Sequence, residues 1–135
     1  MREPLIACVM LVLVGTTASA QKWKDIGKTA AGNMVSVDPK SVVKKSGGLV
    51  EARIRVVFVP PLKAQRGTWA SSRTSATFDC GRRYLAVANQ VYYSDAKSTI
   101  EIERSVNKKP GFGPALGGSF SAVALDYLCK DVPKG

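Results

Sequence analysis

The chain has 135 residues, with 20 lysines and arginines against 10 aspartates and glutamates and no histidine, so its net charge at pH 7 is +10. This length allows one domain with a modest hydrophobic core and excludes two. Without histidine the chain lacks the commonest general base and the commonest metal ligand, and its scattered cations form no long basic tract of the kind that binds nucleic acid.

The first 20 residues have the pattern of a cleavable export signal. An uninterrupted apolar run covers residues 5–14, and Ala18-Ser19-Ala20 supplies a small-x-small cleavage site. We therefore expect cleavage between Ala20 and Gln21, with residues 21–135 as the mature domain. The run is shorter than the roughly 20 apolar residues that span a bilayer, so no transmembrane segment is expected once the signal is removed. The mature protein is then periplasmic, secreted or cell-surface associated.

Export reduces the three cysteines to one pair. Cys8 lies at the start of the apolar run, whereas a lipidation site belongs at its end, so we do not expect lipidation at Cys8. In an oxidising compartment, Cys80 and Cys129 are expected to form an intramolecular disulfide. A bridge across that loop contributes about 4 kcal/mol by chain-entropy arithmetic. Two isolated thiolates do not complete a zinc shell, and no cofactor is expected.

The first half of the mature chain reads as strands separated by turns. Residues 23–28 and 34–37 are short strands, and Asp38-Pro39 ends the second. The clearest strand is 49–59, where apolar and polar residues alternate with the period of two that marks a half-buried strand. Pro60-Pro61 is expected to end it, and residues 62–70 are expected to form a loop.

Alternation returns in the second half of the chain. Residues 71–80, 83–93 and 99–106 are predicted strands, and the segment 110–114, rich in glycine and proline, is predicted to be irregular. Helical spacing of apolar residues then covers 120–130.

Ser119 is the predicted N-cap of this helix. Consecutive strands with short links favour an antiparallel sheet. We therefore predict an α+β fold with about five to six strands and one C-terminal helix, which Cys129 pins to the sheet end that carries Cys80.

No motif in the chain predicts a catalytic site. Glu101 and Glu103 are placed on one strand face by their spacing, but an exposed strand shows the same pattern, so we interpret them as solvated surface. The S-x-x-K match from Ser41 to Lys44 lacks the companion motifs of the enzymes that use it. The larger aromatic residues are expected to pack in the core; they are Trp23, Trp69, Tyr92 and Tyr93.

Several short motifs occur in a recognisable order. They are Trp23 with Ile26-Gly27, then Val35-Ser36-Val37-Asp38-Pro39-Lys40-Ser41, then Ser71-Ser72 before Phe78-Asp79-Cys80 and Arg82-Arg83-Tyr84, and last Pro114, Gly118-Ser119 and Ala124-Leu125-Asp126-Tyr127-Leu128-Cys129-Lys130. Their order and spacing across residues 23–130 resemble the surface-adhesin protein E-like family of bacterial exported proteins. The resemblance implies an antiparallel sheet with a disulfide-tethered C-terminal helix, adhesion to host matrix and plasma proteins, and dimerisation.

Together these features predict a non-enzymatic exported binding or adhesion module of the bacterial envelope. Its basic faces and residues 60–70 are expected to contact protein or acidic-polysaccharide partners, and a homodimer is among the expected assemblies. Two alternatives stay open. One is a structural subunit of an envelope assembly that pairs through exposed strand edges, and the other is a small periplasmic hydrolase that uses carboxylates alone.

Overall fold

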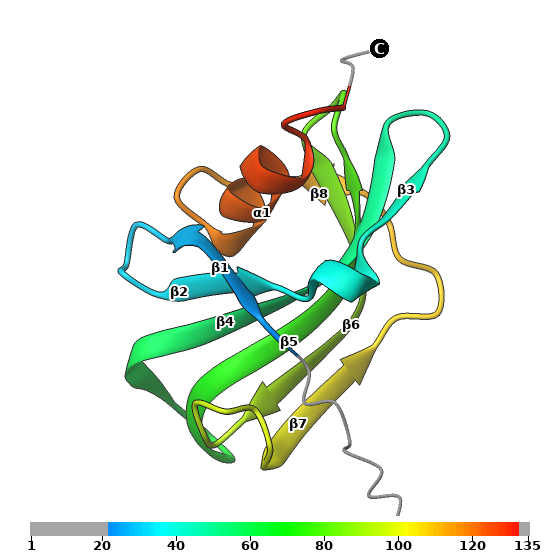
Figure 1. The fold of residues 1–135 in the computed structure, drawn as a ribbon. Helices are drawn as coiled ribbons and strands as arrows, with labels where there is room; N and C mark the ends of the chain where they lie inside the picture. Colours follow the sequence, from blue (N-terminus) through cyan, green and yellow to red (C-terminus); the bar gives the residue numbers. More distant parts are fainter. Residues whose placement is uncertain (1–21, 133–135) are drawn as a thin grey trace, which may run out of the picture.

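One antiparallel sheet curves around a single helix in the part of the chain that the computed structural model describes, residues 22–132 (Figure 1). The predicted export signal and its cleavage position between Ala20 and Gln21 lie outside the described residues. The elements are β1 (Lys24–Lys28), β2 (Met34–Val37), a 3-10 helix (Pro39–Ser41), β3 (Val43–Lys45), β4 (Leu49–Ala64), β5 (Gly67–Asp79), β6 (Tyr84–Tyr93), β7 (Glu101–Val106), β8 (Gly113–Pro114) and α1 (Phe120–Leu128).

The strand order confirms the predicted α+β fold. The sheet runs β1-β2-β4-β5-β6-β7, while β3 pairs with β4 and β8 pairs with β6, so described residues form eight strands rather than five to six. The two extra strands are β3, with three residues, and β8, with two. Neither is long enough to show the alternation by which a strand is recognised in a sequence.

The prediction that β4 ends at Pro60-Pro61 and that a loop follows is wrong. Strand β4 continues to Ala64, and residues Leu62 to Ala64 pair with β5. The register shifts between Val57 and Leu62, so the two prolines lie in a stretch where the ladder requires no N–H donor. Strands β4 and β5 therefore form a long hairpin that extends beyond the rest of the sheet.

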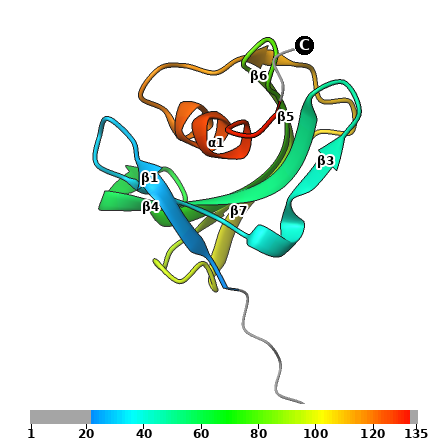
Figure 2. The ribbon, with the colours of Figure 1, turned by 45° about the horizontal axis from the view of Figure 1, so that its top comes forward.

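The helix packs inside the curve of the sheet, as Figure 2 shows. The alternation predicted in β4 is confirmed, because its apolar residues Ala52, Ile54 and Val56 are all buried on the face toward α1. From β5, Phe78 is fully buried, and Leu125 of α1 is buried in the same core. Burial of one such side chain contributes roughly 1.5–3 kcal/mol, so the contact of helix and sheet forms the centre of the domain.

The C-terminus of α1 is joined covalently to the sheet. The disulfide predicted between Cys80 and Cys129 is present, with the two Cα atoms 5.5 Å apart. Cys80 directly follows β5, and Cys129 directly follows the last residue of α1. At the other end, Ser119 occupies the predicted N-cap position, but its hydroxyl donates to the carbonyl of Leu116 instead of capping the helix.

Gly27 sets how closely β1 approaches α1. Its φ is +154°, and a Cβ at this position would lie 2.9 Å from Cγ1 of Val123. We expect Gly27→Ala to lower the free energy of unfolding by about 1–3 kcal/mol, because the added methyl separates strand from helix. Gly117→Ala is the matched control, since its Cβ would meet no atom within 4 Å. Urea unfolding measures both variants, and equal stability of the two would contradict this packing.

Candidate basic cleft at the disulfide end

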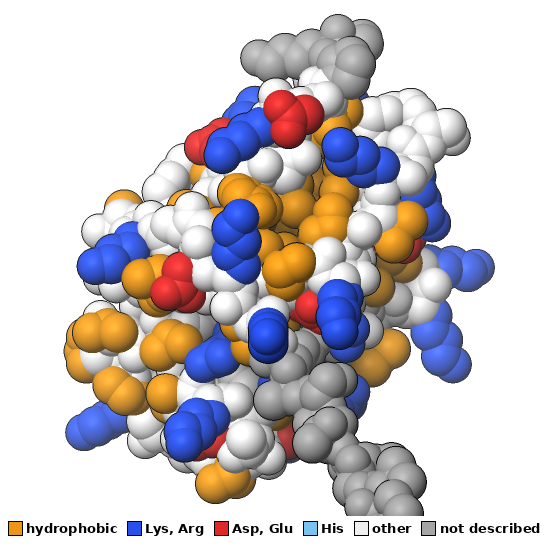
Figure 3. Space-filling view, in the orientation of Figure 1, with side chains coloured by type: hydrophobic (Ala, Val, Ile, Leu, Met, Phe, Trp, Pro, Cys, Tyr) orange, Lys and Arg blue, Asp and Glu red, His pale blue; other side chains and the backbone are white. Residues whose placement is uncertain are grey.

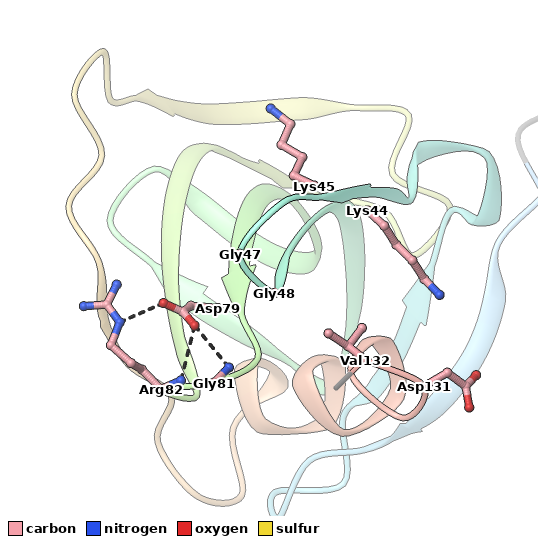
Figure 4. Close-up of a pocket in the computed structure, with 9 residues that line it drawn as sticks. All are labelled: Lys44, Lys45, Gly47, Gly48, Asp79, Gly81, Arg82, Asp131 and Val132. Carbon is pink, nitrogen blue, oxygen red and sulfur yellow. Dashed lines mark hydrogen bonds and ion pairs between the residues drawn. The ribbon is translucent and has the colours of Figure 1, made fainter. Parts of the chain in front are cut away.

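Two adjoining cavities lie at the C-terminal end of α1, and we call them together the basic cleft. The first has a volume of about 660 Å³ (Figure 4) and is lined by Lys44, Lys45, Gly47, Gly48, Asp79, Gly81, Arg82, Asp131 and Val132. The turn between β3 and β4, the turn after β5 and the segment after α1 each supply one wall. Because Cys80 and Cys129 lie in the last two of these walls, the disulfide holds both in place.

The second cavity continues the first along α1. Its volume is about 370 Å³, and its lining consists of Lys24, Val37, Pro39, Val42, Lys44, Tyr127, Leu128, Lys130 and Asp131. The Nζ atoms of Lys24 and Lys130 lie 5.2 and 5.3 Å from the centre of the Tyr127 ring, within the range of cation–π attraction. Figure 3 shows an apolar area between α1 and β3 with lysine and arginine side chains around it.

The charges in the cleft are unbalanced. Arg82 pairs with Asp79 at 2.7 Å, and Lys45 pairs with Glu51 at the same distance. The remaining cations are three lysines with no ion pair inside the described chain, namely Lys24, Lys44 and Lys130. Two acidic residues line the cleft, Asp79, which is paired with Arg82, and Asp131. The cleft thus presents a surplus of positive charge next to apolar side chains.

Asp79 is fixed as an anion in the wall of the first cavity. Its carboxylate accepts hydrogen bonds from Nε of Arg82 at 2.7 Å and from the backbone N–H groups of Gly81 and Arg82 (Figure 4). The side-chain hydrogen bond from Arg82, followed by the backbone one, lowers the pKa of Asp79 below its ordinary value. A carboxylate held in this way organises the turn and is a poor proton donor.

The carboxylate pair weighed from the sequence is not brought together. A register shift in β7 pairs Glu103 with Tyr92 and Glu101 with Tyr93, and adjacent tyrosines of β6 point to opposite faces. The prediction that Glu101 and Glu103 share one face is therefore wrong, because the extra residue of the bulge reverses the alternation. Glu101 is instead paired with Arg104 at 2.6 Å.

The large aromatic residues have different environments. Tyr93 is buried, as expected, whereas Trp69 and Tyr92 are half-buried and stack with ring centres 3.9 Å apart. Trp23 lies 5.8 Å from the Arg55 guanidinium and 5.4 Å from that of Arg73. The prediction of core packing thus holds for Tyr93 and fails for the other three. Those rings are half-buried and are held by stacking or cation–π contacts.

The surplus of lysine charge suits the cleft to contact with an anion. Within residues 22–132, no group of three or more histidine, cysteine or acidic side chains is placed to hold a metal ion. Over the same residues, no helix has the length and hydropathy needed to cross a bilayer. Sequence reasoning missed the basic cleft because Lys24, Lys44 and Lys130 are far apart in the chain, and no local spacing relates them.

The fold and the tethered helix define a class of exported domain, an antiparallel sheet closed on a C-terminal helix by a disulfide. The sequence profile of the family described as surface-adhesin protein E matches residues 23–130. The chain belongs to this family, which confirms the resemblance, and it is an exported protein that is periplasmic, secreted or associated with the cell surface.

Solved structures of Haemophilus influenzae protein E share this fold. Crystal form II is 14% identical in sequence and superposes with a TM-score of 0.57, covering 83% of this chain and 90% of that chain. Protein E from non-typeable Haemophilus influenzae is also 14% identical, with a TM-score of 0.53 and coverage of 85% and 80%. None of the curated proteins matches the sequence. At such low identity the likeness shows the fold alone.

The hydrogen bonds of Asp79 give a direct test of the cleft wall. We expect Arg82→Gln to raise the pKa of Asp79 toward its ordinary value, because the side-chain bond from Arg82 is the largest cause of its lowering. Carboxyl NMR titration of the variant measures this shift. Arg83→Gln is the control, since Arg83 pairs with Asp126 on α1. A similar pKa change in both variants would rule out the specific role given to Arg82.

Proposed function

We propose that the mature domain, residues 21–135 after removal of the export signal, is a non-enzymatic adhesion module that binds an acidic polysaccharide through the basic cleft. The observation that carries the proposal is the placement of Lys24 and Lys130 at the Tyr127 ring, with Lys44 lining the same cavity. The sulfate or carboxylate groups of such a ligand supply negatively charged partners for these lysines, and sugar rings can pack on the apolar lining.

The basic cleft is itself a rigid binding surface. Lys24 belongs to β1, Lys44 to β3, and Lys130 follows α1, so three different elements bring these charges together. The disulfide and the core hold those elements, so little ordering is needed when a ligand binds.

The acidic groups of the domain support binding over catalysis. Catalytic acids and bases need pKa values shifted toward the working pH, whereas the pKa of Asp79 is shifted away from it. Glu101 and Glu103, the pair that a hydrolase would have used, lie on opposite faces of the sheet. These observations support assigning a binding role to the cleft.

Affinity for heparin oligosaccharides tests the proposal. Exposed ion pairs contribute about 0.2–1 kcal/mol each, so replacing Lys24, Lys44 and Lys130 by alanine should weaken binding of a heparin decasaccharide by about tenfold. Calorimetric titration of the mature protein at fixed salt measures the change, because ionic strength screens such contacts.

A second triple variant separates the cleft from general charge. Lys63, Lys97 and Lys108 are exposed residues outside the cleft, and changing them to alanine removes the same total charge. This control should lose less than about threefold in affinity, since it leaves the local cluster intact. An equal loss in the two triple variants, or no saturable binding by the parent protein, would overturn the proposed function.

A further inference from the structure

A separate cavity of different chemistry lies at the opposite end of α1. Its volume is about 320 Å³, and it is lined by Thr29, Ala31, Asn33, Val56, Phe58, Ser72, Gln90, Tyr92, Gly118, Ser119 and Phe120. We call it the neutral groove, because no lining residue carries a formal charge. In a protein of net charge +10, a cavity without cations does not select an anion.

The floor of the groove is the part of the sheet that α1 leaves uncovered. Val56 and Phe58 of β4 and Tyr92 of β6 supply apolar and aromatic surface, and Phe120 closes it at the start of the helix. Tyr92 is backed by Trp69, which stacks on it at 3.9 Å. This stack fixes the tyrosine ring as a flat surface.

The rim of the groove carries neutral hydrogen-bonding groups. Asn33 and Gln90 supply amides, and Thr29 and Ser119 supply hydroxyls, while Ser72 is buried in the floor between Val56 and Tyr92. Amides and hydroxyls can each donate and accept hydrogen bonds, which matches a ligand whose own groups do both.

The walls are held together by hydrogen bonds. The N–H of Ala30 donates to the carbonyl of Gly118 at 2.9 Å, which joins the β1–β2 turn to the segment before α1. The N–H of Val59 donates to Oδ1 of Asn33 at 2.9 Å, which joins the same turn to β4. Gly118 has a φ of +76°, and a Cβ there would lie 2.9 Å from Cβ of Ala30, so the close approach of the two walls requires glycine. The groove is therefore preformed.

We propose that the neutral groove binds one uncharged pyranose ring of an oligosaccharide. The apolar C–H face of a sugar packs on the aromatic floor, while its hydroxyls exchange hydrogen bonds with the amide and hydroxyl rim. The volume lies at the low end of small-molecule sites, which fits a single ring with its substituents. The groove and the basic cleft lie at opposite ends of α1, so this site does not depend on the proposed function.

Fluorescence titration with neutral trisaccharides tests the inference. The chain has two tryptophans, and Trp23→Phe leaves Trp69, behind Tyr92, as the sole reporter. Chitotriose or maltotriose should give a saturable change in Trp69 emission with a midpoint of about 1 mM or below. Tyr92→Leu and Gln90→Ala should each weaken it by at least about fivefold, through loss of the flat ring and of one amide.

Gln90→Ala removes a side chain that hydrogen-bonds to Tyr92 but keeps both rings of the stacked pair, so it keeps the test valid if Tyr92→Leu fails to fold. Lys130→Ala, at the other end of α1, should leave the sugar response unchanged. Lys130 belongs instead to the basic cleft, which the heparin titration probes. No saturable response to either trisaccharide up to about 10 mM, a response equal in all variants, or a concentration-dependent dimer that fills the groove without sugar binding would overturn the inference. Loss of heparin binding alone would contradict only the proposed function.

Discussion

The contact between α1 and the inner face of the sheet holds the domain together. Phe78 and Leu125 are both fully buried there, and the disulfide from Cys80 to Cys129 closes the same contact at one end. A nine-residue helix is too short to be stable alone in water. Its position comes from the sheet, and the segments before and after it are positioned with it.

The two ends of α1 consequently have different roles. After its C-terminus, Asp131, Val132 and Lys130 complete the basic cleft against β1 and the β3–β4 turn. Before its N-terminus, Gly118 and Ser119 complete the neutral groove against the β1–β2 turn. The helix covers only part of the curved sheet, which leaves a cavity at each of its ends. The two cavities share one scaffold but differ in charge. We therefore propose that the acidic and the neutral parts of a glycan are recognised at different ends of the helix.

Much of the fold could be predicted because its signals are local. The alternation in residues 49–59 identified the buried face of β4, and the expected removal of the export signal left Cys80 and Cys129 as one pair. The extension of β4 past Pro60-Pro61 could not be predicted, since it depends on a register shift against β5. The bulge that separates Glu101 from Glu103 is likewise a property of strand pairing. The basic cleft and the neutral groove were missed because they gather residues from distant segments.

The disulfide and the core contact together hold α1 on the sheet and thereby form the cleft. Amide hydrogen exchange of the Cys80→Ala/Cys129→Ala double variant measures this effect, because exchange resolves local opening from global unfolding. We predict that α1 and the segment after it lose protection, while the central strands β4 and β5 keep theirs. Equal loss of protection in all elements, or unchanged protection in α1, would contradict the account.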